Sequence, residues 1–268
     1  MKILHLSDLH LNRTWLEWAK QQAPHYDLVC VSGDLLDMFS RQVPLYGMVV
    51  IKEWADEFPG RLALCSGNHD GNDPVMTPPA QLLPRLGVKD RRHAEKLMLQ
   101  ERWMDALARA AVVTDGRSEL LSIGERRVVV TTIPYDFTEV RWHEDLWRTG
   151  AQLRRESGAP WIVLHHEPPA GTKVGGPYGN SGLPYLVEEY QPNYLLSGHL
   201  HLQPYRGDFA ERLGATWCFN PGVPDGLAAA MADEPNHIAI DLADASASWL
   251  FTNTGTNGRQ NRRLTLRG

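Results

Sequence analysis

Ten side chains that can bind metal ions or move protons follow directly after short apolar runs in this sequence. They are Asp8, His10, Asp34, Asn68, His69, Asp70, His165, His166, His199 and His201. Imidazoles, carboxylates and an amide oxygen together suit borderline or harder divalent ions such as manganese, iron, zinc or nickel. Because no thiolate contributes to the set, a closed structural zinc site is disfavoured.

The size of this set indicates two metal ions rather than one. A single ion rarely needs three carboxylates, an amide and several imidazoles, whereas two neighbouring ions can share them. Two cations about 3.5–4 Å apart need a bridging anion against their repulsion, and a carboxylate such as Asp34 can supply it. Such a pair can deprotonate a water molecule, hold a phosphoryl oxygen and stabilise both sides of an in-line displacement. The residues therefore predict a dinuclear hydrolytic centre.

Two of the histidines, His199 and His201, stand one residue apart in YLLSGHLH, residues 194–201. An extended chain places such a pair on one side of a strand. An isolated pair of this kind is typical of an exposed surface. The carboxylates and histidines at the ends of the other apolar runs favour a role as ligands instead.

The apolar runs themselves have the length and composition of short buried strands. They occur at residues 2–10, 27–37, 61–70, 161–169 and 194–201, each with Asp, Asn or His at its end. Amphipathic segments at residues 15–23 and 46–58 have helical character. Strands that alternate with helices predict a mainly parallel sheet covered on both faces, and ligands of such sheets bind at the carboxyl ends of the strands. We therefore expect all ten polar side chains at one edge of one sheet.

The rest of the chain predicts a single domain over residues 1–253. A Pro-rich loop and a helical segment at residues 71–116 interrupt the strand pattern, and they form either a peripheral insertion or a lid. Residues 126–136 read as another strand, and residues 237–242 and 248–253 as a closing β-hairpin. The basic segment 254–268, with four arginines after residue 258, is expected to be a solvated tail, with nucleic-acid binding as the less favoured alternative.

Composition restricts the class of protein. The formal net charge of −5 disfavours a protein whose affinity depends on the nucleic-acid backbone. The three cysteines are far apart and predict neither a disulfide framework nor a cysteine-based metal site. No run reaches the roughly 18 apolar residues of a membrane helix, and the N-terminus lacks the pattern of a signal peptide. We therefore expect a cytoplasmic protein that does not enter a membrane.

The motifs DLH, GDLLD, GNHD, HH and GHLH, in that order between residues 8 and 201, resemble the five blocks of the calcineurin-like metallophosphoesterase family. The segment NPG, residues 220–222, resembles a further common feature, although Val223 stands where Ser often follows. The resemblance implies an α/β fold of the αββα type, a two-layer β-sandwich flanked by helices. This architecture refines the expectation of one parallel sheet.

By this resemblance, the side chains divide between two metal ions. The first ion would be held by Asp8, His10, Asp34 and His201. The second would be held by Asn68, His165 and His199, with Asp34 as the bridge. The turn at Gly198 would let His199 and His201 reach different ions. A metal-bridging hydroxide would be the nucleophile.

The resemblance also implies roles for the neighbours of these ligands. His69 would steady the phosphate and protonate the leaving oxygen, and Asp70 would orient the imidazole of His69. Either histidine of HH can be the ligand; the family pattern favours His165, which leaves His166 behind the ligands or facing the substrate. Asp37 either helps to position the site or caps a helix.

The expected activity is hydrolysis of phosphoesters, of diesters more than of monoesters, because a proton donor such as His69 assists a poor alkoxide leaving group. Cyclic nucleotides or nucleotide-like small molecules are candidate substrates, and manganese is the ion expected to support activity. In the glycine-rich segment 171–182, Lys173 would lie near the phosphate and Tyr178 would stack on a base, unless this segment is an ordinary surface loop.

Two other functions fit the same motifs less well. A DNA or RNA nuclease of the same family is one alternative, but nuclease members often carry an added DNA-binding domain. A non-catalytic metal-binding scaffold is an alternative of another class. That function predicts eroded motifs, and the motifs of this sequence are intact.

Overall fold

The apolar runs of the N-terminal half form the parallel centre of a first sheet. A computed structural model describes residues 1–37, 44–70, 111–135, 140–224, 226–253 and 258–266, with Met104, Leu107 and Ala108. Within these residues the first sheet contains β1 (Lys2–Leu6), β2 (Leu28–Ser32), β3 (Leu62–Cys65), β10 (His237–Asp241), β11 (Ser246–Thr252) and β12 (Arg259–Thr265). Their order is β12-β11-β10-β1-β2-β3, in which β1, β2 and β3 run parallel and the other pairs are antiparallel.

A second sheet is built from the middle of the chain. Its strands are β4 (Arg117–Ile123), β5 (Arg126–Thr132), β6 (Trp161–Leu164), β7 (Tyr194–Leu196), β8 (Ala210–Leu213) and β9 (Thr216–Phe219). Their order is β4-β5-β6-β7-β9-β8, with a parallel centre from β5 to β9 and an antiparallel strand at each edge.

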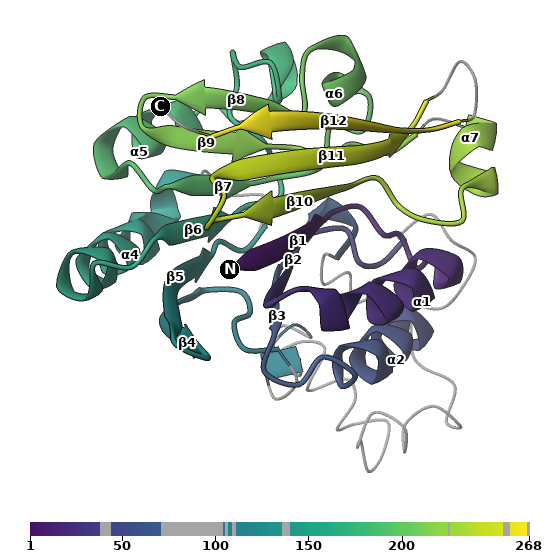
Figure 1. The fold of residues 1–268 in the computed structure, drawn as a ribbon, viewed down its shortest axis with the longest axis horizontal. Helices are drawn as coiled ribbons and strands as arrows, with labels where there is room; N and C mark the ends of the chain where they lie inside the picture. Colours follow the sequence, from purple (N-terminus) through teal and green to yellow (C-terminus); the bar gives the residue numbers. More distant parts are fainter. Residues whose placement is uncertain are drawn as a thin grey trace.

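Helices cover the outer face of each sheet (Figure 1). On the first sheet lie α1 (Arg13–Gln22) and α2 (Pro44–Ala55), and on the second lie α4 (Glu144–Ser157) and α5 (Leu183–Tyr190). Shorter elements are α6 (Gln203–Arg206), α7 (Gly226–Met231) and the 3-10 turns η1 (Ala23–His25), η2 (Asn68–Asp70), η6 (Val140–His143) and η7 (Gly176–Tyr178). In the described ranges, every helix is too short or too polar to cross a membrane.

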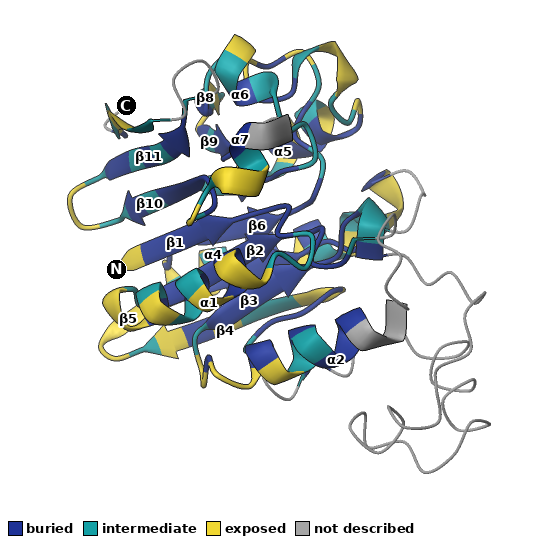
Figure 2. Ribbon diagram, turned by 90° about the vertical axis from the view of Figure 1, so that its right-hand side faces the viewer, coloured by how far each residue is buried: buried dark blue, intermediate teal, exposed yellow. Residues whose placement is uncertain are grey.

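The central strands are buried on both faces because each face packs against a different layer (Figure 2). In β1, Ile3 lies in the core between the sheets, whereas Leu4 and Leu6 lie in the core beneath α1 and α2. In β6, Ile162 faces the other sheet and Trp161 faces α4. Alternation of side chains along each strand thus divides one apolar run between two cores. The predicted αββα architecture is confirmed.

The structure corrects two expectations about the sheets. The prediction of a single parallel sheet was wrong, because the parallel strands belong to two sheets that pack face to face. The prediction of a solvated C-terminal tail was wrong for residues 259–265, which form the edge strand β12 and pair with β11 through seven residue pairs. The closing hairpin of β10 and β11 is confirmed.

Other sequence expectations meet the described residues only in part. Residues 71–103 of the segment 71–116 lie outside the described residues, and its role as a lid stays a prediction.

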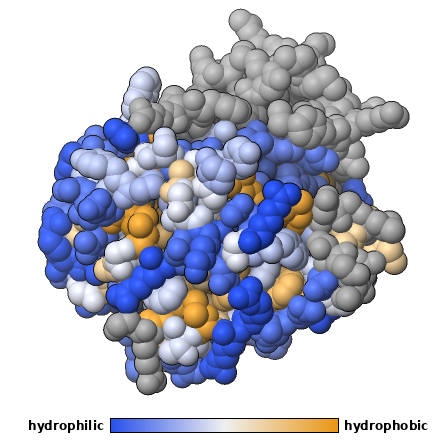
Figure 3. Space-filling model, turned by 90° about the horizontal axis from the view of Figure 1, so that it is seen from above, coloured by the Kyte–Doolittle hydropathy of each residue, from blue (hydrophilic) through white to orange (hydrophobic). Residues whose placement is uncertain are grey.

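The three cysteines are free and buried. The face seen from above in Figure 3 is mainly hydrophilic, with small separate apolar areas among its described residues. On β12, residues 260–263 are exposed and polar or charged, which suits the edge of a sheet.

Candidate metal centre

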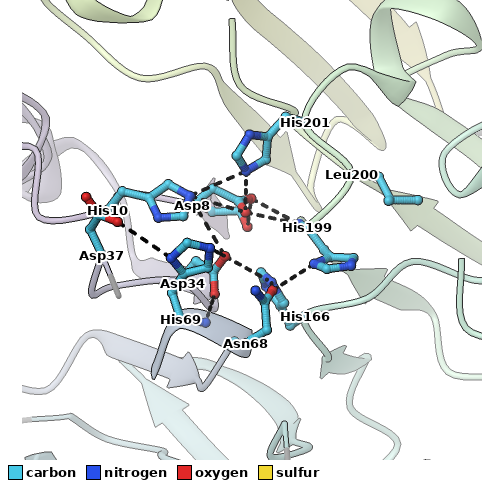
Figure 4. A network of polar contacts seen from close by, with 12 residues as sticks. Asp8, His10, Asp34, Asp37, Asn68, His69, His166, His199, Leu200 and His201 are labelled. Carbon is cyan, nitrogen blue, oxygen red and sulfur yellow. Dashed lines mark hydrogen bonds and ion pairs between the residues drawn. The ribbon is translucent and has the colours of Figure 1, made fainter. Parts of the chain in front are cut away.

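The polar side chains that follow β1, β2, β3, β6 and β7 meet where the carboxyl ends of these strands converge (Figure 4). Backbone hydrogen bonds hold the loops together in pairs. In the first sheet, the N–H of Asp8 donates to the carbonyl of Gly33 over 3.0 Å, and the N–H of His10 donates to that of Asp34 over 2.9 Å. In the second sheet, the N–H of Gly198 donates to the carbonyl of His166 over 2.8 Å. The site therefore spans both sheets.

Glycine allows the two sheets to approach each other here. A Cβ on Gly198, which follows β7, would lie 1.6 Å from Oγ of Ser7 and 2.4 Å from Oδ2 of Asp8 after β1. Gly33 has a φ of +90°, and a Cβ there would lie 2.4 Å from Nδ1 of His166. Any larger residue at either position would push the two halves of the site apart.

The first group of ligand atoms comprises Asp8, His10, Asp34 and His201, whose donor atoms all lie within 4.8 Å of one another. Nε2 of His201 lies 3.1 Å from Oδ1 of Asp8 and 3.4 Å from Nε2 of His10. Nε2 of His10 lies 3.8 Å from Oδ2 of Asp34. Two carboxylates and two imidazoles thus face one point.

The second group forms around the amide of Asn68. Its Oδ1 lies 3.0 Å from Nε2 of His166 and 2.9 Å from Nδ1 of His199. Nε2 of His166 also lies 3.3 Å from Oδ2 of Asp34. Asp34 therefore contacts both groups, as expected for a carboxylate that two ions share.

The structure reverses the placement expected for the histidine pair. His166, not His165, enters the cluster: it is fully buried, and its Nδ1 is fixed by the carbonyl of Ser32 at 2.8 Å. His165 is also buried, but its Nδ1 lies 3.0 Å from the carbonyl of Glu167. Adjacent residues leaving a strand point to opposite sides, so only one of the two can face the other ligands.

His69 lies beside the first group. Its ring packs edge to face against that of His10 with centroids 4.6 Å apart, and its Nε2 lies 4.0 Å from Oδ2 of Asp34. The carboxylate nearest its Nδ1 in the described contacts is Asp37, at 3.7 Å. Of the two roles that the sequence allowed for Asp37, this position favours the one in the site.

The described hydrogen bonds of the Asp70 side chain are with backbone N–H groups rather than with the ring of His69. Its carboxylate accepts hydrogen bonds from the N–H groups of Leu35, Leu36 and Gly67 at 2.8–3.2 Å. These bonds tie the loop after β2 to the loop after β3. Burial and the charge of Asp34 raise the pKa of Asp70 to about 7.

The charged side chains of the cluster shift one another's pKa values. Burial alone would raise the pKa of Asp8, but the facing imidazoles of His201, His166 and His10 outweigh burial and lower it. Burial would lower the pKa of His166, but Asp34 and Asp8 raise it to about 9. Ion-pair partners of Asp8 and Asp34 among the described residues are all histidines.

These residues fit two divalent ions. Two buried carboxylates without a lysine or arginine partner in the described residues carry more negative charge than neutral imidazoles can offset. The donor atoms are nitrogens and oxygens only, which matches ions such as manganese, iron or zinc. The convergence of imidazoles on Oδ1 of Asn68 and on Oδ1 of Asp8 also brings lone pairs together as a cation requires.

The described contacts include none between the cluster and the side chains of the two predicted substrate residues, Lys173 and Tyr178. Tyr178 is 75% exposed, and the side chain of Lys173 is exposed on the same loop. Their roles stay predictions. Tyr135, which the sequence did not single out, lies close instead: its ring centroid is 5.8 Å from that of His166 and 6.5 Å from that of His199. The sequence feature that could have identified Tyr135 is its position at the end of the strand predicted at residues 126–136.

Comparison with known proteins identifies relatives of this arrangement. The family model "Calcineurin-like phosphoesterase" matches residues 1–203. No curated protein matches the sequence. Among solved structures, TT1561 of Thermus thermophilus is similar with a TM-score of 0.55 and 15% identity, over 99% of each chain. Sulfate thiohydrolase SoxB of Thermus thermophilus, in complex with glycerol, is similar with a TM-score of 0.51 and 14% identity, over 99% of this chain and 56% of SoxB. At these identities the structures are evidence for the fold alone.

Proposed function

The chain belongs to the calcineurin-like phosphoesterase family, and from this premise we propose that it hydrolyses phosphodiesters with the help of two divalent metal ions. The single observation that carries the proposal is the meeting of two donor groups that share Asp34. A metal-binding scaffold needs no proton donor, yet His69 lies beside these groups.

The geometry supports one proposed set of ligands for each ion. The first ion would be held by Asp8, His10, Asp34 and His201. The second would be held by Asp34, Asn68, His166 and His199. When bound, the two ions supply positive charge that polarises a phosphoryl group and acidifies water. Manganese is the ion proposed to support activity.

His69 is proposed as the proton donor to the leaving oxygen. The carboxylate of Asp37 lies on the Nδ1 side of the ring, and Nε2 faces the metal cluster. As an imidazolium, His69 would direct its Nδ1–H at Asp37 and carry a second proton on Nε2, which would pass to the leaving oxygen and leave the ring neutral. Asp70 would act indirectly, because its hydrogen bonds fix the loops that carry Asp34 and His69.

The substrate is proposed to be a small phosphodiester, such as a cyclic nucleotide or a nucleotide-like compound. An alkoxide is a poor leaving group, and a positioned proton donor typically accelerates its departure by about 10²–10⁴-fold. A monoester with an acidic leaving group gains less from such a donor. The presence of His69 in the site therefore favours the diester.

Metal analysis and a substrate panel test this function together. We expect about two transition-metal ions per chain after loading, and faster turnover with Mn²⁺ of an aryl diester than of the matched aryl monoester. The panel also contains 2′,3′- and 3′,5′-cyclic nucleotides and single-stranded DNA. Binding of two ions without turnover of any phosphoester would indicate a scaffold. Tight binding of one ion or none under replete conditions would contradict the dinuclear centre.

A further inference from the structure

A pocket opens beside the first metal group, between the start of α1 and α7. Its volume is about 560 Å³, which falls in the range of small-molecule sites. Two of its lining residues, His10 and His201, also belong to the first metal group. The pocket therefore adjoins the place where the phosphate of a substrate would bind.

The apolar residues that line the pocket are fixed by the fold. Leu9, Trp15 and Val223 line it and are buried. Nε1 of Trp15 donates a hydrogen bond to the carbonyl of Ala232 over 2.9 Å, which ties α1 to the segment after α7. The N–H of Val223 donates to the carbonyl of His201 over 3.0 Å. The pocket is thus part of the folded framework.

The charge of the pocket restricts its occupant. Its described lining contains no lysine, arginine, aspartate or glutamate. The side chain of Asn12, a polar lining residue, already accepts hydrogen bonds from the N–H groups of Thr14 and Trp15 through its Oδ1. A second phosphate or a nucleic-acid strand would find no lysine or arginine partner among these residues. Transfer of an uncharged apolar group from water into the pocket would be favourable.

We propose that this pocket binds the uncharged, mainly apolar organic group of the phosphoester substrate. The inference rests on the proposed function for the position of the phosphate. It selects substrates in which a single phosphate group carries an aryl, alkyl or other weakly polar substituent. It excludes from this position a polyphosphate chain and the continuing backbone of a nucleic acid.

Binding of two phosphonates to the manganese-loaded protein tests the pocket without turnover. Calorimetry should show that 1-naphthylphosphonate binds roughly 30-fold more tightly than methylphosphonate, because an aromatic ring leaves water. Ala229→Phe fills the pocket and should reduce this ratio to roughly threefold or less with an unchanged affinity for methylphosphonate. Ala230→Trp repeats the test from an exposed lining position, in case Phe at 229 disturbs folding.

Met231→Trp is the matched control, because Met231 lies on the same helix, is 64% exposed and does not line the pocket. It should keep the wild-type ratio. Equal affinities for the two phosphonates in the wild type, or an unchanged ratio in both filled variants, would overturn the proposal. Hydrolysis of an aryl diester is measured in parallel. Its absence, together with a clear naphthyl preference, would refute the proposed function and leave the pocket assignment standing.

Discussion

Exchange of the two adjacent histidines for glutamine tests which of them binds metal. His166→Gln removes an imidazole whose Nε2 lies 3.0 Å from Oδ1 of Asn68 and 3.3 Å from Oδ2 of Asp34. His165→Gln removes one whose Nδ1 lies beside the carbonyl of Glu167. Both positions are buried and glutamine preserves hydrogen-bonding capacity at each, so the pair is matched in burial and chemistry.

The expected magnitude follows from the role of a ligand. Loss of a residue that only supports a ligand commonly lowers metal affinity by about 10–100-fold, so loss of His166 itself should cost at least about 100-fold. At free Mn²⁺ ten times the wild-type Kd, occupancy of the second site would then fall from about 90% to about 10%. For His165→Gln we expect the wild-type occupancy of about 90% and a loss of only about 1–2 kcal/mol of unfolding free energy, from one disturbed buried hydrogen bond.

Metal content at fixed free Mn²⁺, measured by mass spectrometry, and hydrolysis of an aryl diester report the outcome. His166→Gln should bind one ion per chain fewer and lose activity in proportion, with partial recovery at a 100-fold higher metal concentration. His165→Gln should resemble the wild type in both assays. The assignment of His166 is refuted if His165→Gln loses the ion and His166→Gln keeps both.

Three further predictions concern other parts of the molecule. His69→Ala should lower kcat for a diester by about 10²–10⁴-fold while two ions per chain remain, and loss of an ion would instead make His69 a ligand. Gly198→Ala should lower the melting temperature and the metal content, since its Cβ would lie 1.6 Å from Oγ of Ser7. Gly214→Ala is the control for metal content, because Gly214 has a φ of +61° but open space around the added Cβ. Burial lowers the pKa of His237 to about 4, so the unfolded chain binds a proton that the folded chain does not between pH 6.5 and 4. Stability should thus fall by about 3 kcal/mol as the pH drops through that window, and denaturant titrations of His237→Gln should show a shallower pH dependence than the wild type.

The positions of the polar residues along the chain were enough to predict where the metal-binding side chains would meet. A buried strand such as β1 ends where its sequence turns polar, and Asp8 and His10 stand at that point. The carboxyl ends of parallel strands share an edge, so separate motifs were expected to meet. The division into two sheets did not follow from the same pattern. A strand with two apolar faces looks identical whether its second face meets a helix or another sheet.

Two differences between the structure and the sequence-based expectations have a clear physical origin. His165 and His166 differ by one residue, and the side that each faces depends on where β6 ends at Leu164, which hydrophobicity does not determine to within one position. The strand β12, RQNRRLT, lacks apolar alternation. It is held through backbone pairing with β11, a contribution that the side-chain pattern of the sequence does not record.

The backbone at the ligands explains why the site needs the whole fold. Asp8, His10, Asp34 and His199 have φ values of 55°, 44°, 54° and 64°, in the left-handed region that costs a residue other than glycine about 1 kcal/mol or more. This conformation turns the chain sharply away from its strand direction, and so directs the four side chains toward the two donor groups. It persists because the loops bind one another: the N–H of His199 donates to the carboxylate of Asp8 at 3.1–3.2 Å, between the two sheets. The packing of one sheet on the other therefore opposes the strain and positions the donor atoms.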